Sequence, residues 1–131
     1  MAFYVDTSAA VKLVVKERET AALRAWCERH DGQLVASDLT RTELLRATRR
    51  SAPDRVTQAR AVLETLTLLS LPADLFERAA DLEPAVLRTL DAVHLAAAMA
   101  LGDDLEGIVT YDERFAGAAE AHGIPVVTPG A

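Results

Sequence analysis

The chain has 131 residues, of which 50% are hydrophobic and 26% are charged, so its length and composition are those of one globular domain with a buried core. Its longest unbroken apolar run, residues 95–101, is too short to cross a bilayer, and no secretory signal precedes it, so we expect a soluble cytoplasmic protein without a membrane partner. The single cysteine, Cys27, excludes an internal disulfide and a cysteine-rich zinc site.

The formal net charge of −6 argues mildly against a nucleic-acid partner, but the charge is unevenly distributed. Residues 41–60 contain six arginines against only Glu43 and Asp54. A basic stretch on an acidic chain can follow a phosphate backbone, and it is equally consistent with a solvated helix face. Charge alone therefore does not identify the partner.

Short β-type runs alternate with helical apolar spacing along the whole chain. The expected order is strand 3–5, helices 8–16 and 20–30, strand 34–36, helices 39–50 and 53–65, strand 68–71, helices 73–82 and 91–101, strand 107–110, helix 113–122 and strand 125–128. The run at 68–71 is the least clear because it continues a helical pattern. This alternation predicts parallel βαβ units and an α/β sandwich, with residues 1–131 in a single domain.

Four acids fall where an open parallel sheet places its ligands, beyond the carboxyl ends of the strands. Asp6 follows the first strand, and Asp112 follows the strand that ends near Thr110. Glu43 lies in the first turns of helix 39–50, and Asp91 opens helix 91–101. We therefore expect these four side chains to converge on one edge of the sheet.

Each acid also has a purely structural explanation. Residues 40–43 have the form of a capping box, while Asp6, Asp91 and Asp112 occupy positions where a helix N-cap is favourable. Four caps are a weaker explanation than a shared site, because Asp6 and Glu43 interrupt apolar surroundings. Clustered carboxylates repel one another unless a cation neutralises them, and Mg²⁺ or Mn²⁺ suits an all-oxygen site.

Four strings of the sequence resemble, in order, the motifs of PIN-domain ribonucleases. They are D-T-S-A at 6–9, S-D-L-T-R-T-E-L at 37–44, L-R-T-L-D-A-V-H-L-A at 87–96 and T-Y-D-E-R-F at 110–115. The strings are most similar to the VapC toxins of bacterial and archaeal toxin–antitoxin pairs. The resemblance covers nearly the whole chain, and all four acidic positions of the pattern are filled.

The resemblance implies a three-layer α/β/α sandwich whose central parallel sheet has the order 3-2-1-4-5. It also implies that Asp6, Glu43, Asp91 and Asp112 form a metal-binding catalytic quartet of a Mg²⁺- or Mn²⁺-dependent endoribonuclease. Relatives of this kind cleave a tRNA or a ribosomal RNA, pair with a VapB-type antitoxin and form homodimers. We therefore expect an RNA substrate, a cognate antitoxin and a homodimer for this chain.

Three further polar residues lie close to the quartet in the sequence. Ser8 and Thr110 can hydrogen-bond a carboxylate or a metal-bound water, and capping or strand-end roles explain them equally well. His94 follows Asp91 by one helical turn, and a structural role is favoured because metal–water hydrolysis needs no imidazole.

Other phosphoryl-transfer folds fit the sequence less well. A response-regulator receiver usually has an adjacent acidic pair after its first strand and a lysine near its last strand, and neither is present. A haloacid-dehalogenase phosphatase needs D-x-D, whereas Ser8 stands at the second position, and no phosphate-binding glycine loop occurs. The remaining alternative is a non-catalytic protein-interaction module whose acidic pocket receives a basic residue of a partner.

Overall fold

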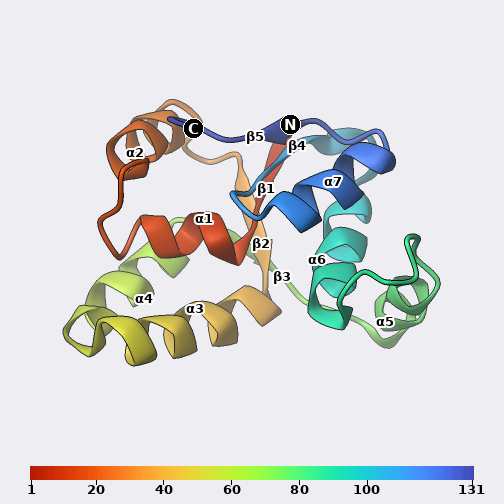
Figure 1. The fold of residues 1–131 in the computed structure, drawn as a ribbon, viewed down its shortest axis with the longest axis horizontal. Coiled ribbons are helices and arrows are strands. Elements are labelled where there is room, and N and C mark those ends of the chain that lie inside the picture. Colours follow the sequence, from red (N-terminus) through yellow and green to blue (C-terminus); the bar gives the residue numbers. More distant parts are fainter.

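A parallel sheet of five strands runs through the middle of the computed structural model, which describes all residues from Met1 to Ala131 (Figure 1). The strands are β1 (Ala2–Val5), β2 (Leu34–Ser37), β3 (Thr67–Leu69), β4 (Leu105–Val109) and β5 (Val126–Val127). Their order in the sheet is β3-β2-β1-β4-β5, with every pairing parallel. This confirms the expected strand order and leaves β1 in the centre of the sheet.

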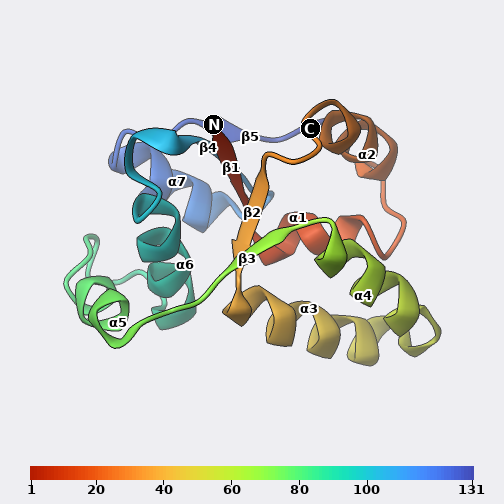
Figure 2. The same ribbon diagram turned by 180° about the vertical axis from the view of Figure 1, so that it is seen from behind.

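Helices cover both faces of the sheet, as the two opposite views show (Figures 1 and 2). One layer contains α1 (Thr7–Lys12), α2 (Thr20–Arg29), α3 (Asp38–Ser51), the 3₁₀ turn η1 (Pro53–Arg55) and α4 (Val56–Glu64). The other contains α5 (Ala73–Ala80), α6 (Thr89–Met99) and α7 (Glu113–Ala121), and the 3₁₀ turn η2 (Gly102–Asp104) leads into β4. None of these helices combines the length and the apolar character needed to span a bilayer.

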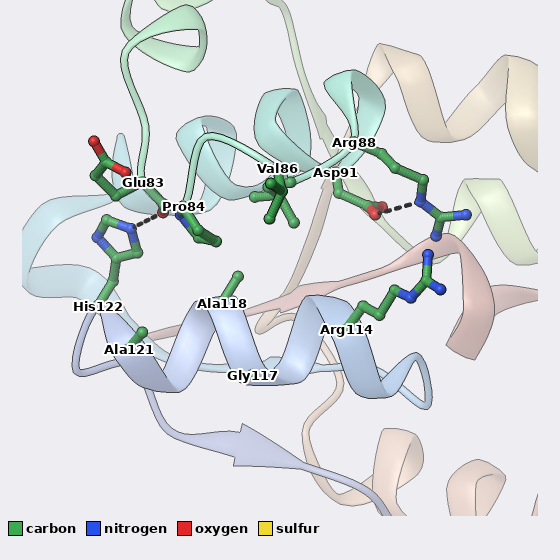
Figure 3. Close-up of a pocket in the computed structure, with 11 residues that line it drawn as sticks. Glu83, Pro84, Val86, Arg88, Asp91, Arg114, Gly117, Ala118, Ala121 and His122 are labelled. Atoms are coloured by element: carbon green, nitrogen blue, oxygen red, sulfur yellow. Dashed lines mark hydrogen bonds and ion pairs between the residues drawn. The ribbon is translucent and has the colours of Figure 1, made fainter.

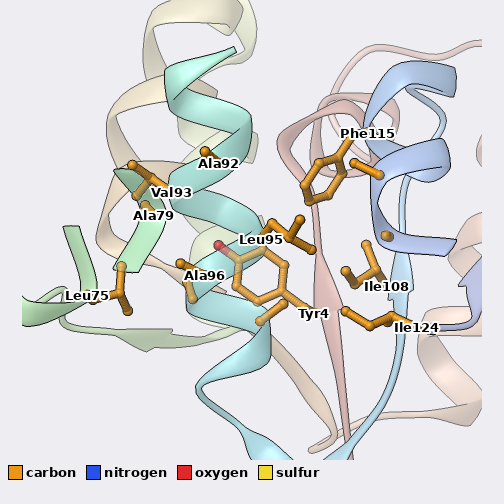
Figure 4. Close-up of a cluster of buried hydrophobic side chains, with 14 of the residues drawn as sticks. Tyr4, Leu75, Ala79, Ala92, Val93, Leu95, Ala96, Ile108, Phe115 and Ile124 are labelled. Carbon is orange, nitrogen blue, oxygen red and sulfur yellow. The ribbon is translucent and has the colours of Figure 1, made fainter. Parts of the chain in front are cut away.

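The strands are apolar on both faces because each face is covered by a helical layer. On one face, Tyr4 and Ile108 pack with Leu95 and Phe115 in a core of 16 buried residues between the sheet and α5–α7 (Figure 4). On the other face, Val5 belongs to a second cluster that packs against α1 and α2. A third cluster joins α1, α3 and α4.

Every expected strand and helix is present, including a strand at the unclear run, although β3 spans Thr67–Leu69 rather than 68–71. The helix expected at 8–16 ends at Lys12, four residues early. One cause is that Val14 and Val15 are β-branched and therefore favour helix less. The other is that the Thr20 hydroxyl donates a hydrogen bond to the Lys12 carbonyl oxygen (2.7 Å), which takes the place of a helical N–H donor there.

Two further differences from the expected pattern concern the site. The helix expected at 91–101 begins at Thr89, so Asp91 lies inside its first turn rather than at its cap. The capping box expected at 40–43 is also wrong, because Ser37 is the N-cap of α3 and pairs with Thr40. Glu43 is thereby free of any capping role.

We expect Phe115→Ala to lower the free energy of unfolding by about 3–5 kcal/mol, because the ring is fully buried between α7 and the sheet. Phe76→Ala is the matched control, since its ring on α5 is 49% exposed, and it should cost less than about 1 kcal/mol. Urea unfolding of both variants measures the difference. Equal losses would show that the core does not lie where the fold puts it.

Candidate functional site

The register between β1 and β4 brings the ends of these two strands together. Val5 pairs with Val109, and the Asp6 N–H donates to the Val109 carbonyl oxygen (2.9 Å). Asp6 and Thr110, the next residue of each strand, therefore lie side by side. The helices α1 and α3 also begin at this carboxyl edge of the sheet (Figure 1).

The carboxylate of Asp6 is buried, with the residue only 6% exposed. Its Oδ2 accepts hydrogen bonds from the hydroxyls of Ser8 and Thr110, each at 2.9 Å. The backbone N–H groups of Tyr111 and Asp112 donate in turn to these two hydroxyl oxygens, at 3.0 and 3.1 Å. The hydroxyl protons are thus aimed at Oδ2, while no hydrogen bond reaches Oδ1, which stays available to a ligand.

Glu43 projects from α3 and is held by two donors. The Thr7 hydroxyl donates to Oε1 at 2.7 Å, and Nε2 of His94 donates to the same oxygen at 2.5 Å. Burial by itself raises the pKa of Glu43, but the hydrogen bond and charge of His94 and the hydrogen bond of Thr7 more than offset it, so the net pKa lies below its usual value. Glu43 therefore stays ionised.

His94 connects Glu43 to the core. His94 is only 1% exposed, and its Nδ1 lies 2.7 Å from the Tyr4 hydroxyl oxygen. The Tyr4 hydroxyl also donates a hydrogen bond to Ser37 Oγ (3.1 Å). Burial raises the pKa of Tyr4, so the phenol stays protonated. The favoured structural role of His94 thus includes a contact with Glu43 that the sequence did not indicate.

Asp91 and Asp112 are bridged by an arginine that the sequence analysis missed. Nε of Arg88 lies 3.2 Å from Asp91 Oδ2, and its Nη2 lies 3.2 Å from Asp112 Oδ2. Asp112 also caps α7, since its Oδ1 accepts from the N–H groups of Arg114 (2.9 Å) and Phe115 (3.2 Å). The i,i+3 spacing of Arg88 and Asp91 was the available signal, but it gives no hint of Asp112.

The pKa of Asp91 is raised despite this ion pair. Burial is the main cause, Arg88 opposes it, and the charges of Asp112 and Asp6 reinforce it. Arg88 compensates only in part because its side chain is 61% exposed and water screens it.

The four expected residues thus lie at one edge, linked by shared partners. Thr110 hydrogen-bonds both Asp6 and Asp112, Arg88 pairs with Asp112 and Asp91, and Thr7, next to Asp6, donates to Glu43. No three histidine, cysteine, aspartate or glutamate side chains are close enough, as they stand, to hold a metal ion.

The donor set still fits a hard divalent cation. Its donors are carboxylate oxygens, Asp6 Oδ1 is free, and Mg²⁺ keeps several of its waters, which widens the distance at which carboxylates can serve it. The capping explanation holds for Asp112 alone. Asp6 sits at the N-cap of α1 without a side-chain cap bond, and Asp91 and Glu43 lie inside helices.

Comparison with known proteins gives a family match and relatives that cover nearly the whole chain. The family model described as PIN domain matches residues 3–121. Ribonuclease VapC47 of Mycobacterium tuberculosis (strain CDC 1551 / Oshkosh) is 39% identical over 132 residues, covering 98% of this chain and 97% of the relative. Ribonuclease VapC46 of Mycobacterium tuberculosis (strain ATCC 25618 / H37Rv) is 41% identical over 128 residues, covering 98% of both chains.

Two solved structures share the fold over nearly their full length. The crystal structure of Mycobacterium tuberculosis VapC20, described as a sarcin-ricin loop cleaving toxin, matches with a TM-score of 0.79 and 18% identity, covering 98% of this chain and 100% of that one. A chain of a toxin–antitoxin complex from Klebsiella pneumoniae matches with a TM-score of 0.73 and 25% identity, covering 98% of both.

We expect Asp91→Asn to unfold, without metal, at or above the wild-type melting temperature. Folding raises the pKa of Asp91, so the folded protein favours the protonated form of this side chain. Asp91 therefore contributes fully to stability at pH values below its pKa in the unfolded chain, and this contribution is lost as the pH rises through its pKa in the folded protein. At pH 7 the ionised group therefore destabilises the fold, and asparagine removes that cost. Glu77→Gln, an exposed acid in the middle of α5, is the control that should change little.

The same melts with Mg²⁺ test Asp91 as a ligand. At ten times Kd, Mg²⁺ should stabilise the wild type and the Glu77→Gln control by about 1.4 kcal/mol, and Asp91→Asn by much less. Equal metal shifts in all three proteins would remove Asp91 from the site.

Proposed function

This chain belongs to the PIN-domain family and, within it, to the VapC ribonucleases, and from that premise we propose that it is a metal-dependent endoribonuclease toxin that cleaves a cellular tRNA or ribosomal RNA. We also propose that residues 1–131 form one PIN domain. The observation that carries the proposal is Asp6, a buried carboxylate at the end of the central strand with one oxygen free. Such a group costs free energy in a protein that does not use it.

Asp6, Asp91 and Asp112 would hold Mg²⁺ or Mn²⁺, with Glu43 acting directly or through water. A divalent cation bound there would lower the pKa of a bound water and neutralise charge on the phosphate. Support comes from the hard oxygen donors of all four side chains and from their common edge of the sheet.

The protein's own groups would hold these acids in the reactive arrangement. The Ser8 and Thr110 hydroxyls keep Asp6 Oδ2 occupied, so the carboxylate presents Oδ1. Thr7 and His94 keep Glu43 ionised and fixed, which suits a group that orients an attacking water. His94 is then a positioning residue and not a catalytic one.

The arginines of α3, η1 and α4 would bind the RNA backbone, because Arg41, Arg46, Arg49, Arg50, Arg55 and Arg60 are all exposed. Their contributions differ. Nε of Arg55 donates to the Val14 carbonyl oxygen (2.7 Å), which gives it a structural contact. Arg41 pairs with Asp38, whereas Arg46, Arg49, Arg50 and Arg60 make no ion pair. Of these four, Arg46 is nearest to Glu43 in the sequence, so we choose it to test a phosphate contact, which gives affinity rather than base choice.

A VapB-type antitoxin is the proposed partner, since VapC toxins pair with antitoxins and one similar chain comes from a toxin–antitoxin complex. A homodimer is proposed on the same family ground. The second candidate function is a non-catalytic module whose acidic edge receives a basic residue of its partner. One observation favours it: Arg88 shows that Asp91 and Asp112 accept a guanidinium.

Asp6→Asn should abolish RNA cleavage by the purified protein while leaving the fold intact, because the amide oxygen can still accept both hydroxyl bonds. EDTA should silence the wild type, and added Mg²⁺ or Mn²⁺ should restore it. Gel analysis of cleaved bulk tRNA and ribosomal RNA measures both effects, with Glu77→Gln as the active control. Undiminished cleavage in EDTA would rule out the metal mechanism, and the absence of any cleavage with added Mg²⁺ or Mn²⁺ would favour the non-catalytic module.

Arg46→Ala should weaken RNA binding similarly for all sequences and reduce the slope of log K against log salt by about 1, as expected when one phosphate contact is lost. Arg78→Ala on α5 is the control, because Arg78 is exposed in the opposite layer and pairs with Asp74. Binding titrations of the Asp6→Asn background at several salt concentrations provide the slopes. Identical slopes for both variants would contradict a backbone contact at Arg46.

A further inference from the structure

A groove of about 770 Å³ lies between the segment that precedes α6 and the helix α7 (Figure 3). This volume falls within the range of about 300–1,000 Å³ that is usual for small-ligand sites. One wall is formed by Pro84, Val86 and Leu87, and the other by Gly117, Ala118 and Ala121. Both walls are therefore mainly apolar.

The groove has polar groups only at its ends. At one end, Nε2 of His122 lies 2.7 Å from the Glu83 carbonyl oxygen and ties α7 to the opposite wall. At the other end lie Asp91, Arg88 and Arg114, with the two guanidinium groups extending toward the same space (Figure 3). Asp91 belongs both to the groove and to the acidic edge, so the two are continuous.

Two features of the walls suit a flat ligand. Val86 is 90% exposed, so an apolar side chain stands at the rim without a partner in the chain. Opposite it, Gly117 is an exposed glycine inside α7, and no atom lies within 4 Å of the position that a Cβ would take. A slot with apolar walls and few polar groups at its ends can hold a nucleobase, as pockets for unstacked bases do.

The charges at the open end favour a polyanion over a basic peptide. Arg114 makes no ion pair, while Arg88 is shared between Asp91 and Asp112. Arg114 thus offers an uncommitted guanidinium beside the acidic edge, and guanidinium groups bind phosphate well. A basic partner residue that entered by the groove would meet two arginines first.

We propose that this groove binds one nucleotide of the RNA next to the cleaved phosphodiester, with the base between the two walls and a flanking phosphate on Arg114. The proposal rests on the proposed ribonuclease function. It gives the groove a role in choosing the cleavage position, because apolar walls of fixed spacing and polar groups at the far end discriminate among bases by size and hydrogen bonding.

Gly117→Leu tests the groove because it adds a side chain into the slot, and leucine favours helix more than glycine does, so the fold should be kept. Glu120→Leu is the matched control: it adds the same side chain at an exposed position of α7 that does not line the groove. Thermal melts of both variants check that each is folded. Arg114→Ala removes the proposed phosphate contact alone.

The binding arm uses the four nucleoside 5′-monophosphates and inorganic phosphate as probes, with amide NMR shifts of the metal-free full chain as readout. At least one nucleotide should shift the amides of Leu87, Gly117 and Ala118, whereas inorganic phosphate should affect only the Arg114 end. Gly117→Leu should abolish the nucleotide shifts, and Glu120→Leu should keep them. The proposal is overturned if none of the four nucleotides shifts the amides that line the groove.

The cleavage arm uses a short oligoribonucleotide taken from a mapped cleavage site. Gly117→Leu should lower kcat/KM roughly tenfold or more, the size expected for loss of one stacked base, and Glu120→Leu less than about twofold. The proposal is overturned if Gly117→Leu cleaves at the wild-type rate and positions. It is also overturned if Gly117→Leu loses antitoxin binding while its cleavage is unchanged. If the wild type cleaves no RNA, the ribonuclease function fails, and the NMR arm still decides whether the groove binds nucleotides.

Discussion

At the end of the central strand, the carboxylate of Asp6 is buried and accepts two hydroxyl hydrogen bonds, one from Ser8 two residues away and one from Thr110, which is 104 residues away. Ser8 comes from α1, and Thr110 follows β4, so the arrangement exists only when both elements are in place. The backbone N–H groups of Tyr111 and Asp112 then fix the two hydroxyls. Because a buried charge without partners is costly, the position of Asp6 constrains how α1, β4 and the turn after β4 meet.

A second constraint joins the two helical layers at the same edge. Glu43 belongs to α3 in one layer and His94 to α6 in the other, and their hydrogen bond passes across the carboxyl end of the sheet. Tyr4 and Ser37 continue this chain of contacts into β1 and β2. A displacement of either layer would therefore move Glu43. The precision of the edge comes from these polar contacts, while the apolar clusters below it provide most of the burial.

Much of this arrangement follows from local patterns in the sequence. Short apolar β-type runs and period-3.6 apolar spacing identified the strands and helices, and the acids stood out because they lie at the ends of apolar runs that share one edge of a parallel sheet. The helix ends were less predictable because side chains far along the chain decide them, as when the Thr20 hydroxyl takes the Lys12 carbonyl. Arg88 was missed for the same reason, since Asp112 lies 24 residues away.

Arg88 explains how an acidic edge can persist without a metal ion. Its guanidinium supplies positive charge to Asp91 and Asp112, yet it is 61% exposed, so each ion pair is screened and easily broken. The raised pKa of Asp91 shows that this compensation is incomplete. A divalent cation or a basic residue of an antitoxin would compete with Arg88 for the same oxygens. Arg88 also lines the groove, so its release from the acids would leave a guanidinium beside the proposed nucleotide site, where a phosphate group would be its natural partner.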